Sequence, residues 1–305
     1  MQFRGGVQLD LPLARSAVDR DYLARTRPEL FDELWADPTT RILPMFNGAV
    51  LLDAQALRLL PVESVPSAQY RVYLGRDETG PVVLAVLSEN AAHALEPETE
   101  NWHHLRRTGA GLSDRDAGLF TQGLAIANWH ATHQHCPRCG TPTLVEGGGW
   151  VRRCFKDDTQ HYPRTDPAVI VAIIDEEDRI LLGSQGAWED NRWSILAGFV
   201  EPGESLEAAV SREMFEEAGV NVTETTYLGS QAWPFPFSLM LGFAARVAGA
   251  TITPDGEEIE KLRWFSREEL AAEAKNLLLP NRISIARSII ELWFGGEIVS
   301  ASESK

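Results

Sequence analysis

Hydrophobic positions along the chain follow two spacings, and together they predict a mixed α/β protein. Residues 168–174 form a continuous aliphatic run, which is typical of a strand buried on both faces. From Asp114 to about Thr132, apolar side chains instead recur every three or four positions, which predicts a helix with one broad apolar face. That face consists of Leu119, Phe120, Leu124, Ala127 and Trp129.

Turn residues between apolar runs predict hairpins in the first third of the chain. The pair Asn47-Gly48 separates the runs 41–46 and 49–52, and this dipeptide favours a two-residue hairpin. A second hairpin is predicted for 70–74 and 82–87, around the turn 77–80. Further strands are expected at 179–182, 226–230, 239–247 and 263–265.

Capping residues predict where three later helices begin. Ser205 is an N-cap candidate, and Gly219 lies where a glycine often ends a helix. Ser266 and Glu269 have the spacing of a capping box. Asn281 is expected to cap the final helix, whose apolar positions are Ile283, Ala286, Ile290 and Trp293.

Composition narrows the class of protein. The 305 residues are 44% hydrophobic and 24% charged, as in a globular chain large enough for two domains and a smaller element. A net charge of −16 argues against a broad basic surface for long nucleic acids, although a local basic patch could bind an RNA end. No apolar run is long enough to cross a membrane, so no membrane partner is expected. Three cysteines cannot all pair within one chain, which indicates a reducing, cytoplasmic setting.

Three carboxylates near the middle of the C-terminal half indicate a cation site. Glu213, Glu216 and Glu217 are spaced i, i+3, i+4, which places them on one helix face about 5–6 Å apart. Like charges this close repel unless a cation neutralises them, and oxygen-only ligands suit Mg²⁺ or Mn²⁺. The alternative is a solvated acidic helix face, but it explains neither the glycines before the helix nor Arg212.

The stretch 134–163 has the pattern of a zinc ribbon. Cys136 and Cys139 form one Cys-x2-Cys arm, a triglycine turn follows, and Cys154 begins a second arm. A complete ribbon would have Cys-x2-Cys twice, whereas here Asp157 occupies the fourth position. The alternatives for that ligand are Asp158, His135, His161 and water. A redox role is disfavoured because no thioredoxin-like βαβ pattern surrounds the first arm.

The residues from Gly198 to Val220 follow the pattern G-x5-E-x7-R-E-U-x-E-E-x-G-U, where U is aliphatic. This pattern resembles the Nudix box, the signature of hydrolases that cleave nucleoside diphosphates linked to another moiety. The resemblance implies that the three box carboxylates bind the catalytic metal, and one of them could also act as a base. Glu204 and Arg212 are then expected to form an ion pair that fixes the loop to the helix without contacting substrate.

A further metal-binding carboxylate is implied by the segment 258–265, which resembles the strand that supplies this ligand in the family. Glu258 matches the metal-binding position. Glu257 is the immediate competitor, and a surface glutamate in an acidic loop is the alternative.

The segment 230–238 reads Ser-Gln-Ala-Trp-Pro-Phe-Pro-Phe-Ser and resembles the S-Q-x-W-P-F-P-x-S motif of NADH pyrophosphatases, the NudC-like Nudix enzymes. Its prolines stiffen the loop, and its aromatic rings have flat faces suited to a base or a nicotinamide ring. Gln231, Trp233 and Ser238 are therefore candidate substrate contacts. The alternatives are an aromatic turn packed into the core and a plug between subunits.

The resemblance extends over most of the chain, because 129–140 and 161–164 look like the family's entry into and exit from its zinc ribbon. In that family a phenylalanine of the box loop and a tyrosine of the exit segment flank the nicotinamide ring, and Phe199 and Tyr162 match them. An alanine of the last helix, matching Ala286, contacts the ligand through its backbone. Core packing is the alternative for the two aromatic residues, and plain helix filling for the alanine.

This resemblance implies an α/β (α+β) protein with a Nudix fold, in which a mixed sheet lies between helices, an N-terminal α/β domain and a small zinc ribbon. We expect the N-terminal domain at 1–130, the ribbon at 131–165 and the catalytic domain at 166–300. The implied activity is hydrolysis of the diphosphate of NADH or NAD⁺ to NMN(H) and AMP with Mg²⁺ or Mn²⁺, beside a structural Zn²⁺. NAD-capped RNA is a further substrate class, and a homodimer is expected.

Two other functions remain as alternatives at this point. A Nudix hydrolase of ADP-ribose or diadenosine polyphosphates is disfavoured by the 230–238 motif. A non-catalytic NAD sensor is disfavoured by the intact set of box carboxylates.

Overall fold

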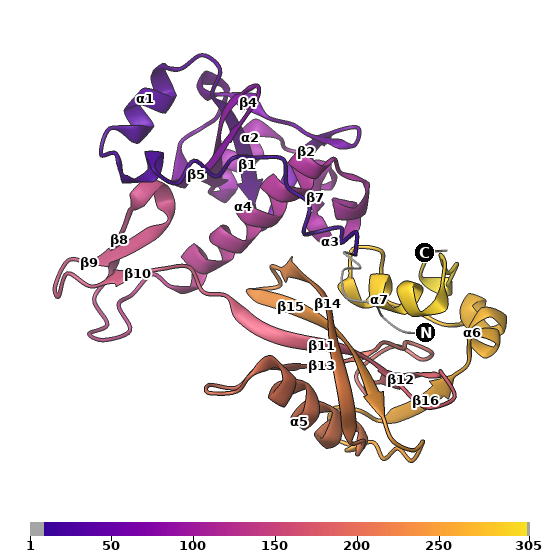
Figure 1. The fold of residues 1–305 in the computed structure, drawn as a ribbon. Coiled ribbons are helices and arrows are strands. Elements are labelled where there is room, and N and C mark those ends of the chain that lie inside the picture. Colours follow the sequence, from indigo (N-terminus) through magenta and orange to yellow (C-terminus); the bar gives the residue numbers. More distant parts are fainter. Residues whose placement is uncertain (1–8, 304–305) are drawn as a thin grey trace. The chain divides into compact units, whose positions relative to one another are not determined.

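The computed structural model describes residues 9–303, which form two compact units (Figure 1). The C-terminal unit contains the described residues up to Ala14 together with 166–232 and 238–303. The N-terminal unit contains 15–165 and 233–237. Both units combine sheets with helices, so the predicted α/β class is confirmed. In the described residues, no helix is long and apolar enough to cross a membrane.

The N-terminal unit is built on a seven-stranded mixed sheet. The strand order is β3-β2-β1-β6-β5, with β4 paired to β1 and β7 paired to β2, and β1 runs parallel to β6. The strands are β1 (Arg41–Phe46), β2 (Ala49–Asp53), β3 (Ala56–Leu57), β4 (Leu60–Pro61), β5 (Ala68–Asp77), β6 (Gly80–Leu87) and β7 (Trp102–His104). The α-helices of this unit are α1 (Leu30–Ala36), α2 (Glu89–Leu95), α3 (Leu105–Thr108) and α4 (Asp114–Thr132).

Local signals in this unit act as predicted. Asn47 and Gly48 have φ values of 48° and 73°, as a type I′ turn between β1 and β2 requires. Asp77 Oδ1 accepts from the Thr79 N–H at 2.7 Å and shapes the β5–β6 turn. Helix α4 spans the predicted residues, and its five predicted apolar side chains are all buried. Both hairpins and the long helix are therefore confirmed.

The zinc-ribbon segment forms its own three-stranded antiparallel sheet. Its order is β10-β9-β8, made by β8 (Thr143–Glu146), β9 (Val151–Cys154) and β10 (Gln160–His161). The triglycine turn 147–149 joins β8 to β9, and all three of its glycines have positive φ.

A six-stranded sheet with helices on both faces makes the C-terminal unit. The strand order is β14-β15-β11-β12-β16, with β13 paired to β11, and β11 runs parallel to β15. The strands are β11 (Asp166–Ile174), β12 (Ile180–Ser184), β13 (Leu196–Phe199), β14 (Val222–Trp233), β15 (Ser238–Val247) and β16 (Lys261–Phe265). The α-helices are α5 (Leu206–Ala218), α6 (Arg267–Glu273) and α7 (Ile285–Phe294).

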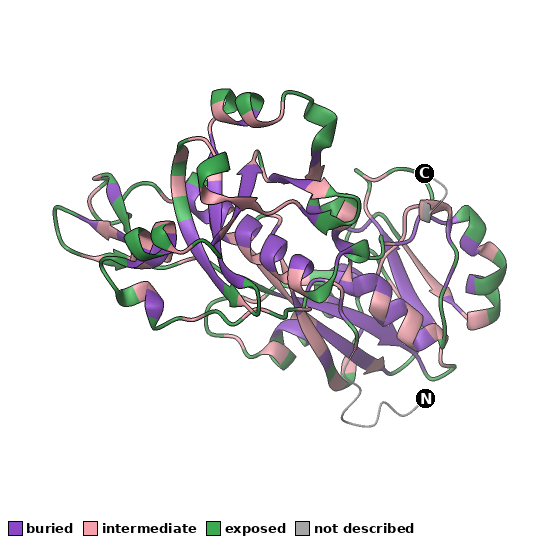
Figure 2. Ribbon diagram, turned by 90° about the horizontal axis from the view of Figure 1, so that it is seen from above, coloured by how far each residue is buried: buried purple, intermediate pink, exposed green. Residues whose placement is uncertain are grey.

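The aliphatic run of β11 explains this layered arrangement. Val169, Val171 and Ile173 point into a core with α5, whereas Ile170 and Ala172 point into a core with α7. Because alternate residues of a strand face opposite sides, a continuous apolar run needs cover on both faces. Buried residues, purple in Figure 2, accordingly follow the strands, while exposed green residues lie on loops and outer helix turns.

Two of the three predicted helix starts are confirmed and one is wrong. Ser205 caps α5 by accepting from the Ala208 N–H, and Ser266 caps α6 within a complete capping box. Helix α7 is capped by Ser284, whose side chain accepts from the Ala286 N–H, and not by Asn281. Asn281 lies in the preceding turn, where its carbonyl accepts from the Ser284 N–H. Ser284 is the better-placed capping oxygen because it directly precedes the first helical residue.

Two short segments cluster with a unit other than the one that their place in the sequence suggests. We expected residues 1–130 to form that domain, but the described residues 9–14 cluster with the C-terminal unit. Leu11 is buried in the core that contains α7, and Leu13 N donates to the buried Gln231 side chain. The segment 233–237 of the aromatic motif clusters with the N-terminal unit.

A buried histidine ties α4 to the ribbon within the N-terminal unit. His130 is 1% exposed; its Nε2 lies 2.8 Å from Gly149 O and its Nδ1 lies 2.9 Å from Arg152 Nη1. Because Arg152 can only donate, Nδ1 must accept, which requires the neutral ring with its proton on Nε2. Burial, together with the charge of Arg152, lowers the pKa of His130 to about 4.

The stability of the protein should therefore fall in mild acid. The unfolded chain takes up a proton on His130 near pH 6.5, whereas the folded chain resists until about pH 4. The free energy of unfolding is thus expected to be fully retained above pH 6.5 and to drop by at most about 3 kcal/mol as the pH falls toward 4. Urea unfolding at several pH values measures this. A His130→Gln variant should show a smaller loss between pH 7 and 5, and an unchanged loss would contradict the assignment.

Candidate active site and metal centres

The box loop and α5 meet at a glycine. Gly198 lies in β13, and a Cβ atom built on it would lie 1.9 Å from the carboxyl carbon of Glu213. Any larger residue would displace this carboxylate, so the first glycine of the box pattern has a direct steric reason. The contact holds Glu213 of α5 against the strand that begins the loop.

Arg212 is the centre of an ion-pair network. Its Nε donates to Glu204 Oε1 at 2.7 Å, and its Nη2 donates to Glu204 Oε2 at 2.9 Å. Its Nη1 lies 2.9 Å from both Glu213 Oε1 and Glu216 Oε2. The bidentate bond to Arg212 lowers the pKa of Glu204 to about 2. The expected ion pair between loop and helix is therefore present, and it also reaches two carboxylates of the box.

Glu217 is the most constrained carboxylate of the cluster. The residue is 4% exposed, and its Oε2 has no hydrogen-bond partner within the described part of the chain. Burial, followed by the charges of Glu213 and Glu258, raises the pKa of Glu217 to about 8. A buried, unpartnered carboxylate beside other carboxylates fits a bound cation, which would satisfy the free oxygen and offset the repulsion.

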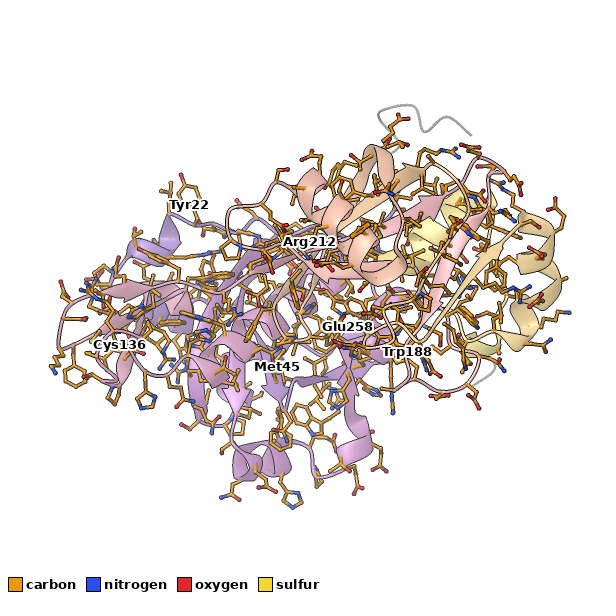
Figure 3. All side chains as sticks on the ribbon, turned by 90° about the horizontal axis from the view of Figure 1, so that it is seen from below. Tyr22, Met45, Cys136, Trp188, Arg212 and Glu258 are labelled. Carbon is orange, nitrogen blue, oxygen red and sulfur yellow. The ribbon has the colours of Figure 1, made fainter. Side chains whose placement is uncertain are left out.

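Glu258 lies in the loop before β16 and not in the strand itself, which begins at Lys261. Burial is the main cause that raises the pKa of both Glu213 and Glu217, and the charge of Glu258 adds to it in both cases. The charge of Glu257 is not among the causes of either shift, which favours Glu258 over Glu257 as the loop carboxylate near α5. Figure 3 labels Glu258 together with Arg212 of α5.

Sequence reasoning missed Asp255, which organises the loop that carries Glu258. Asp255 Oδ1 accepts from the Ile259 N–H at 2.8 Å, and its Oδ2 accepts from the Glu258 N–H at 3.2 Å. An aspartate that accepts from the backbone N–H groups following it fixes a local turn. The Asp255-Gly256 pair is the sequence signal that indicates such a turn.

The aromatic rings of 233–237 are engaged inside the N-terminal unit. The guanidinium carbon of Arg106 lies 5.0 Å from the ring centroid of Trp233 and 3.8 Å from that of Phe235. The two rings meet edge to face at 4.9 Å, and the Asn128 amide donates to two proline carbonyls of the loop. These cation–π contacts agree with the alternative that the loop is a packed aromatic turn. Trp233 nevertheless remains partly exposed.

Two of the predicted substrate contacts are instead used within the C-terminal unit. Gln231 is 1% exposed; its Oε1 accepts from Leu13 N at 3.0 Å, and its Nε2 donates to Ile283 O at 2.8 Å. Ala286 is 2% exposed, and its N–H donates to the capping Ser284 Oγ. In this structure the bonded groups of both residues have partners within the unit, and the ligand contacts predicted for Gln231 and Ala286 stay predictions.

Phe199, Tyr162 and Ser238 keep accessible surface. Phe199 ends β13 and is 59% exposed, and Tyr162 directly follows β10 and is 63% exposed. Ser238 begins β15 and is half-buried. The two aromatic residues belong to different units, and each presents its ring to the surface of its own unit. Core packing is therefore excluded as the reason for either ring.

The ribbon brings four candidate zinc ligands together. The four residues are Cys136, Cys139, Cys154 and Asp157. Each offers one ligand atom, a thiol sulfur or a carboxylate oxygen, and these four atoms all lie within 4.8 Å of one another. This compact set of three sulfurs and one carboxylate suits tetrahedral Zn²⁺. Asp158 instead pairs with Arg153 at 3.0 Å, so the structure favours Asp157 as the fourth ligand. Cys136, labelled in Figure 3, marks the site within the N-terminal unit.

The layered mixed sheet, the glycine loop and the capped helix with clustered carboxylates define a Nudix hydrolase. A family model of the NUDIX domain matches residues 164–287. The NADH pyrophosphatase-like rudimentary NUDIX domain matches 39–129, and the NADH pyrophosphatase zinc ribbon domain matches 131–162. The chain belongs to the NADH pyrophosphatase (NudC-like) family of Nudix hydrolases. The ribbon match and the cysteine–aspartate cluster together support a structural zinc ion.

Similarity to known proteins extends over both units. The NAD-capped RNA hydrolase NudC of Mycobacterium tuberculosis is 38% identical over 309 residues, which cover 92% of this chain and 94% of that protein. The NAD-capped RNA hydrolase NUDT12 of Homo sapiens is 37% identical over 196 residues, which cover 60% of this chain and 42% of that protein. A NUDIX hydrolase from Nitrosomonas europaea of known crystal structure matches 55% of this chain and 96% of its own, with a TM-score of 0.42 and 22% identity.

Proposed function

We propose that this protein hydrolyses the diphosphate bond of NADH or NAD⁺ to NMN(H) and AMP, and that it removes NAD caps from RNA by breaking the same bond. The observation that carries the proposal is the buried, unpartnered carboxylate of Glu217, whose pKa the charges of Glu213 and Glu258 raise further. Such a cluster supports metal-dependent chemistry at a diphosphate. The choice of NAD(H) is supported by the family models and by the names of the NudC and NUDT12 relatives.

Mg²⁺ or Mn²⁺ is the proposed catalytic cofactor, held by Glu213, Glu216, Glu217 and Glu258. An all-carboxylate donor set suits a hard divalent cation, which neutralises the diphosphate and lowers the pKa of a bound water. One box glutamate would accept the proton of the attacking water. Arg212 and Glu204 would keep the loop and the helix in register without contacting substrate.

We propose as substrate contacts those residues that the sequence predicted to bind substrate and that keep exposed surface in the structure. Phe199 and Tyr162 present exposed rings that suit stacking on a nicotinamide or a base. Trp233 and Ser238 are partly exposed and would orient the dinucleotide. These four roles rest on the family resemblance together with the exposure of each residue.

The remaining proposals concern the whole protein. We propose the domain limits 1–130, 131–165 and 166–300, with residues 9–14 packed on the catalytic part. We also propose a homodimer, as the family resemblance implies. A reducing, cytoplasmic setting is supported by three cysteines that form no disulfide.

Product analysis tests the proposed reaction. The protein is incubated with NADH and Mg²⁺, and the products are identified by mass spectrometry. NMNH and AMP are the expected products. ADP-ribose with nicotinamide, or no turnover with any divalent cation, would contradict the proposal. Faster cleavage of ADP-ribose or diadenosine polyphosphates than of NADH would favour another Nudix specificity.

The loop residue Asp255 should affect catalysis through Glu258. We expect Asp255→Ala to lower kcat about tenfold, because an incorrectly placed catalytic group costs rate even when it remains in the site. The Mg²⁺ concentration that gives half the maximal rate should rise as well. Asp255→Asn keeps one acceptor oxygen and should retain most of the activity. The matched control is Glu257→Ala, and an equal loss in that variant would show that Asp255 has no special role.

A further inference from the structure

A basic cavity of about 910 Å³ lies within the N-terminal unit, apart from every residue assigned above to metal binding. Its walls come from the residues 25–31 around the 3₁₀ turn η1 (Ala24–Thr26), from the ribbon turn and β9, and from the end of the ribbon. Ligand pockets commonly have volumes of about 300–1,000 Å³ and combine apolar walls with a few polar groups. The cavity is therefore large enough for a nucleotide.

The charge of the lining opposes the charge of the chain. Three arginines, Arg25, Arg27 and Arg153, line the cavity against one carboxylate, Glu146, although the whole chain carries a net charge of −16. Glu33 and Asp158, which do not line the cavity, pair with Arg27 and Arg153, so the positive charge left to attract an anion into this concave site is that of Arg25.

Arg25 differs from the other two arginines in its partners. Arg27 pairs with Glu33 at 2.8 Å, and Arg153 pairs with Glu146 at 2.8 Å. In the described residues Arg25 makes no ion pair within 4 Å, although the charge of Asp21 acts on it, and its buried Nε has no hydrogen-bond partner there. Its Nε is buried and its Nη2 already donates to a backbone carbonyl, so Nη1 is the donor left for a phosphate oxygen.

The position of Arg25 is fixed before any ligand binds. Its guanidinium carbon lies 4.0 Å from the ring centroid of Trp150, and the indole N–H of Trp150 donates to Tyr73 O at 2.8 Å. Arg25 Nη2 also donates to Arg20 O at 3.0 Å. A stacked and tethered arginine loses little conformational entropy when it binds an anion, which favours binding.

The wall opposite Arg25 requires glycine. Gly148 has a φ of +60°, and a Cβ atom built on it would lie 3.1 Å from Leu30 Cδ2 and 3.4 Å from Arg25 Cβ. The ribbon turn can therefore approach the 25–30 segment closely only because it lacks side chains there. Phe31 adds aromatic surface to the same lining. Tyr162 borders the cavity too, but it is proposed above as a dinucleotide contact, so the base contact is placed on Phe31.

We propose that this cavity binds a nucleoside 5′-phosphate, with its phosphate on Arg25 and its base against the aromatic lining. Aromatic faces combined with arginine form the common recognition surface for single-stranded nucleic acid. The bound nucleotide could belong to an RNA chain or be a free mononucleotide. The inference goes beyond the proposed diphosphatase activity. Because AMP and 5′-phosphorylated RNA are also products of that reaction, the test compares variants of an arginine outside the proposed catalytic site.

Binding of a 5′-monophosphorylated single-stranded RNA of about eight nucleotides tests the site. The RNA carries a 3′ fluorophore, and anisotropy is measured with the full-length protein in buffer without added Mg²⁺ or Mn²⁺. Arg25→Gln is expected to weaken the affinity about tenfold, since a charge-assisted bond to phosphate is lost. The matched control is Arg58→Gln, a surface arginine of the same unit that pairs with Asp53 outside the cavity. Hydrolysis of NADH should be unchanged in both variants.

Two further measurements complete the test. Competition with AMP identifies the source: displacement of the RNA by AMP indicates a mononucleotide site, and no displacement indicates a site for the RNA chain. Photo-crosslinking of a 4-thiouridine RNA to the wild-type protein should label peptides from 25–31 or 145–163, and it does not depend on the folding of any variant. Equal RNA affinities of the two variants, or crosslinks confined to other peptides, would overturn the proposal even if NADH hydrolysis is found.

Discussion

Replacing Glu216 by glutamine is expected to reduce the turnover of NADH with Mg²⁺ by about 10³-fold. Loss of this proposed metal ligand weakens the cation's hold, and losing one strong electrostatic stabiliser of the transition state costs about 3–4 kcal/mol in the barrier. Glutamine has the same size and can still bond to Arg212, but it carries no negative charge for the metal. The side chain of Glu216 is 57% exposed, so its replacement should cost little stability. Initial rates of AMP release at saturating Mg²⁺ measure the effect.

The same helix provides a matched control for this prediction. Glu207 is an exposed carboxylate in the first turn of α5, outside the spacing of the metal face. Glu207→Gln should retain nearly the full rate. Circular dichroism and thermal melting should show that both variants keep the wild-type fold. A Glu216→Gln variant with near-normal turnover would show that the metal assignment is wrong.

Replacing Cys154 by serine is expected to remove the zinc ion and to destabilise the ribbon strongly. Cys154 is fully buried at the end of β9, and the ribbon has little hydrophobic core of its own. In a structural zinc site the metal-binding energy is also folding energy, so losing a thiolate should cost several kcal/mol. Metal analysis should find about one zinc ion per wild-type chain and almost none in the variant. Wild-type protein without zinc would refute a stable site.

Substituting each of two adjacent aspartates, Asp157 and Asp158, tests which one is the fourth zinc ligand. Asp157→Asn should weaken zinc retention during competition with a chelator, because an amide oxygen is a poorer ligand than a carboxylate. Asp158→Asn should leave zinc binding unchanged, because Asp158 faces Arg153 and is largely exposed. If the two variants release zinc equally fast, Asp157 is not the ligand.

Local sequence signals predicted most of the secondary structure because their causes are local. Asn47-Gly48 forms its turn because both residues tolerate positive φ, and Ser205 and Ser266 cap helices through oxygens only a few bonds away. The prediction for α7 was wrong for a local reason as well. Asn281 and Ser284 are both good capping residues, and only the path of the chain between them decides which one precedes the first helical turn.

Contacts between distant segments were not predictable in the same way. Gln231 was predicted to contact substrate because of its place in a motif, yet its amide joins Leu13 to Ile283 in the interior. The aromatic loop was predicted to offer free ring faces, whereas Arg106 covers two of the rings. Neither partner could be identified from spacing, since nothing in the motif specifies which remote side chain will pack against it.

The sequence by itself determined the chemistry of the box, because the i, i+3, i+4 spacing places Glu213, Glu216 and Glu217 on one helix face in any helix. Only the tertiary structure decided how those three carboxylates differ. Glu217 is buried with an unpartnered oxygen, whereas Glu216 is exposed and bound to Arg212. The physical reason is that burial and the charge of remote residues such as Glu258 set the free energy of each carboxylate, and both depend on how the sheet and loops pack around α5.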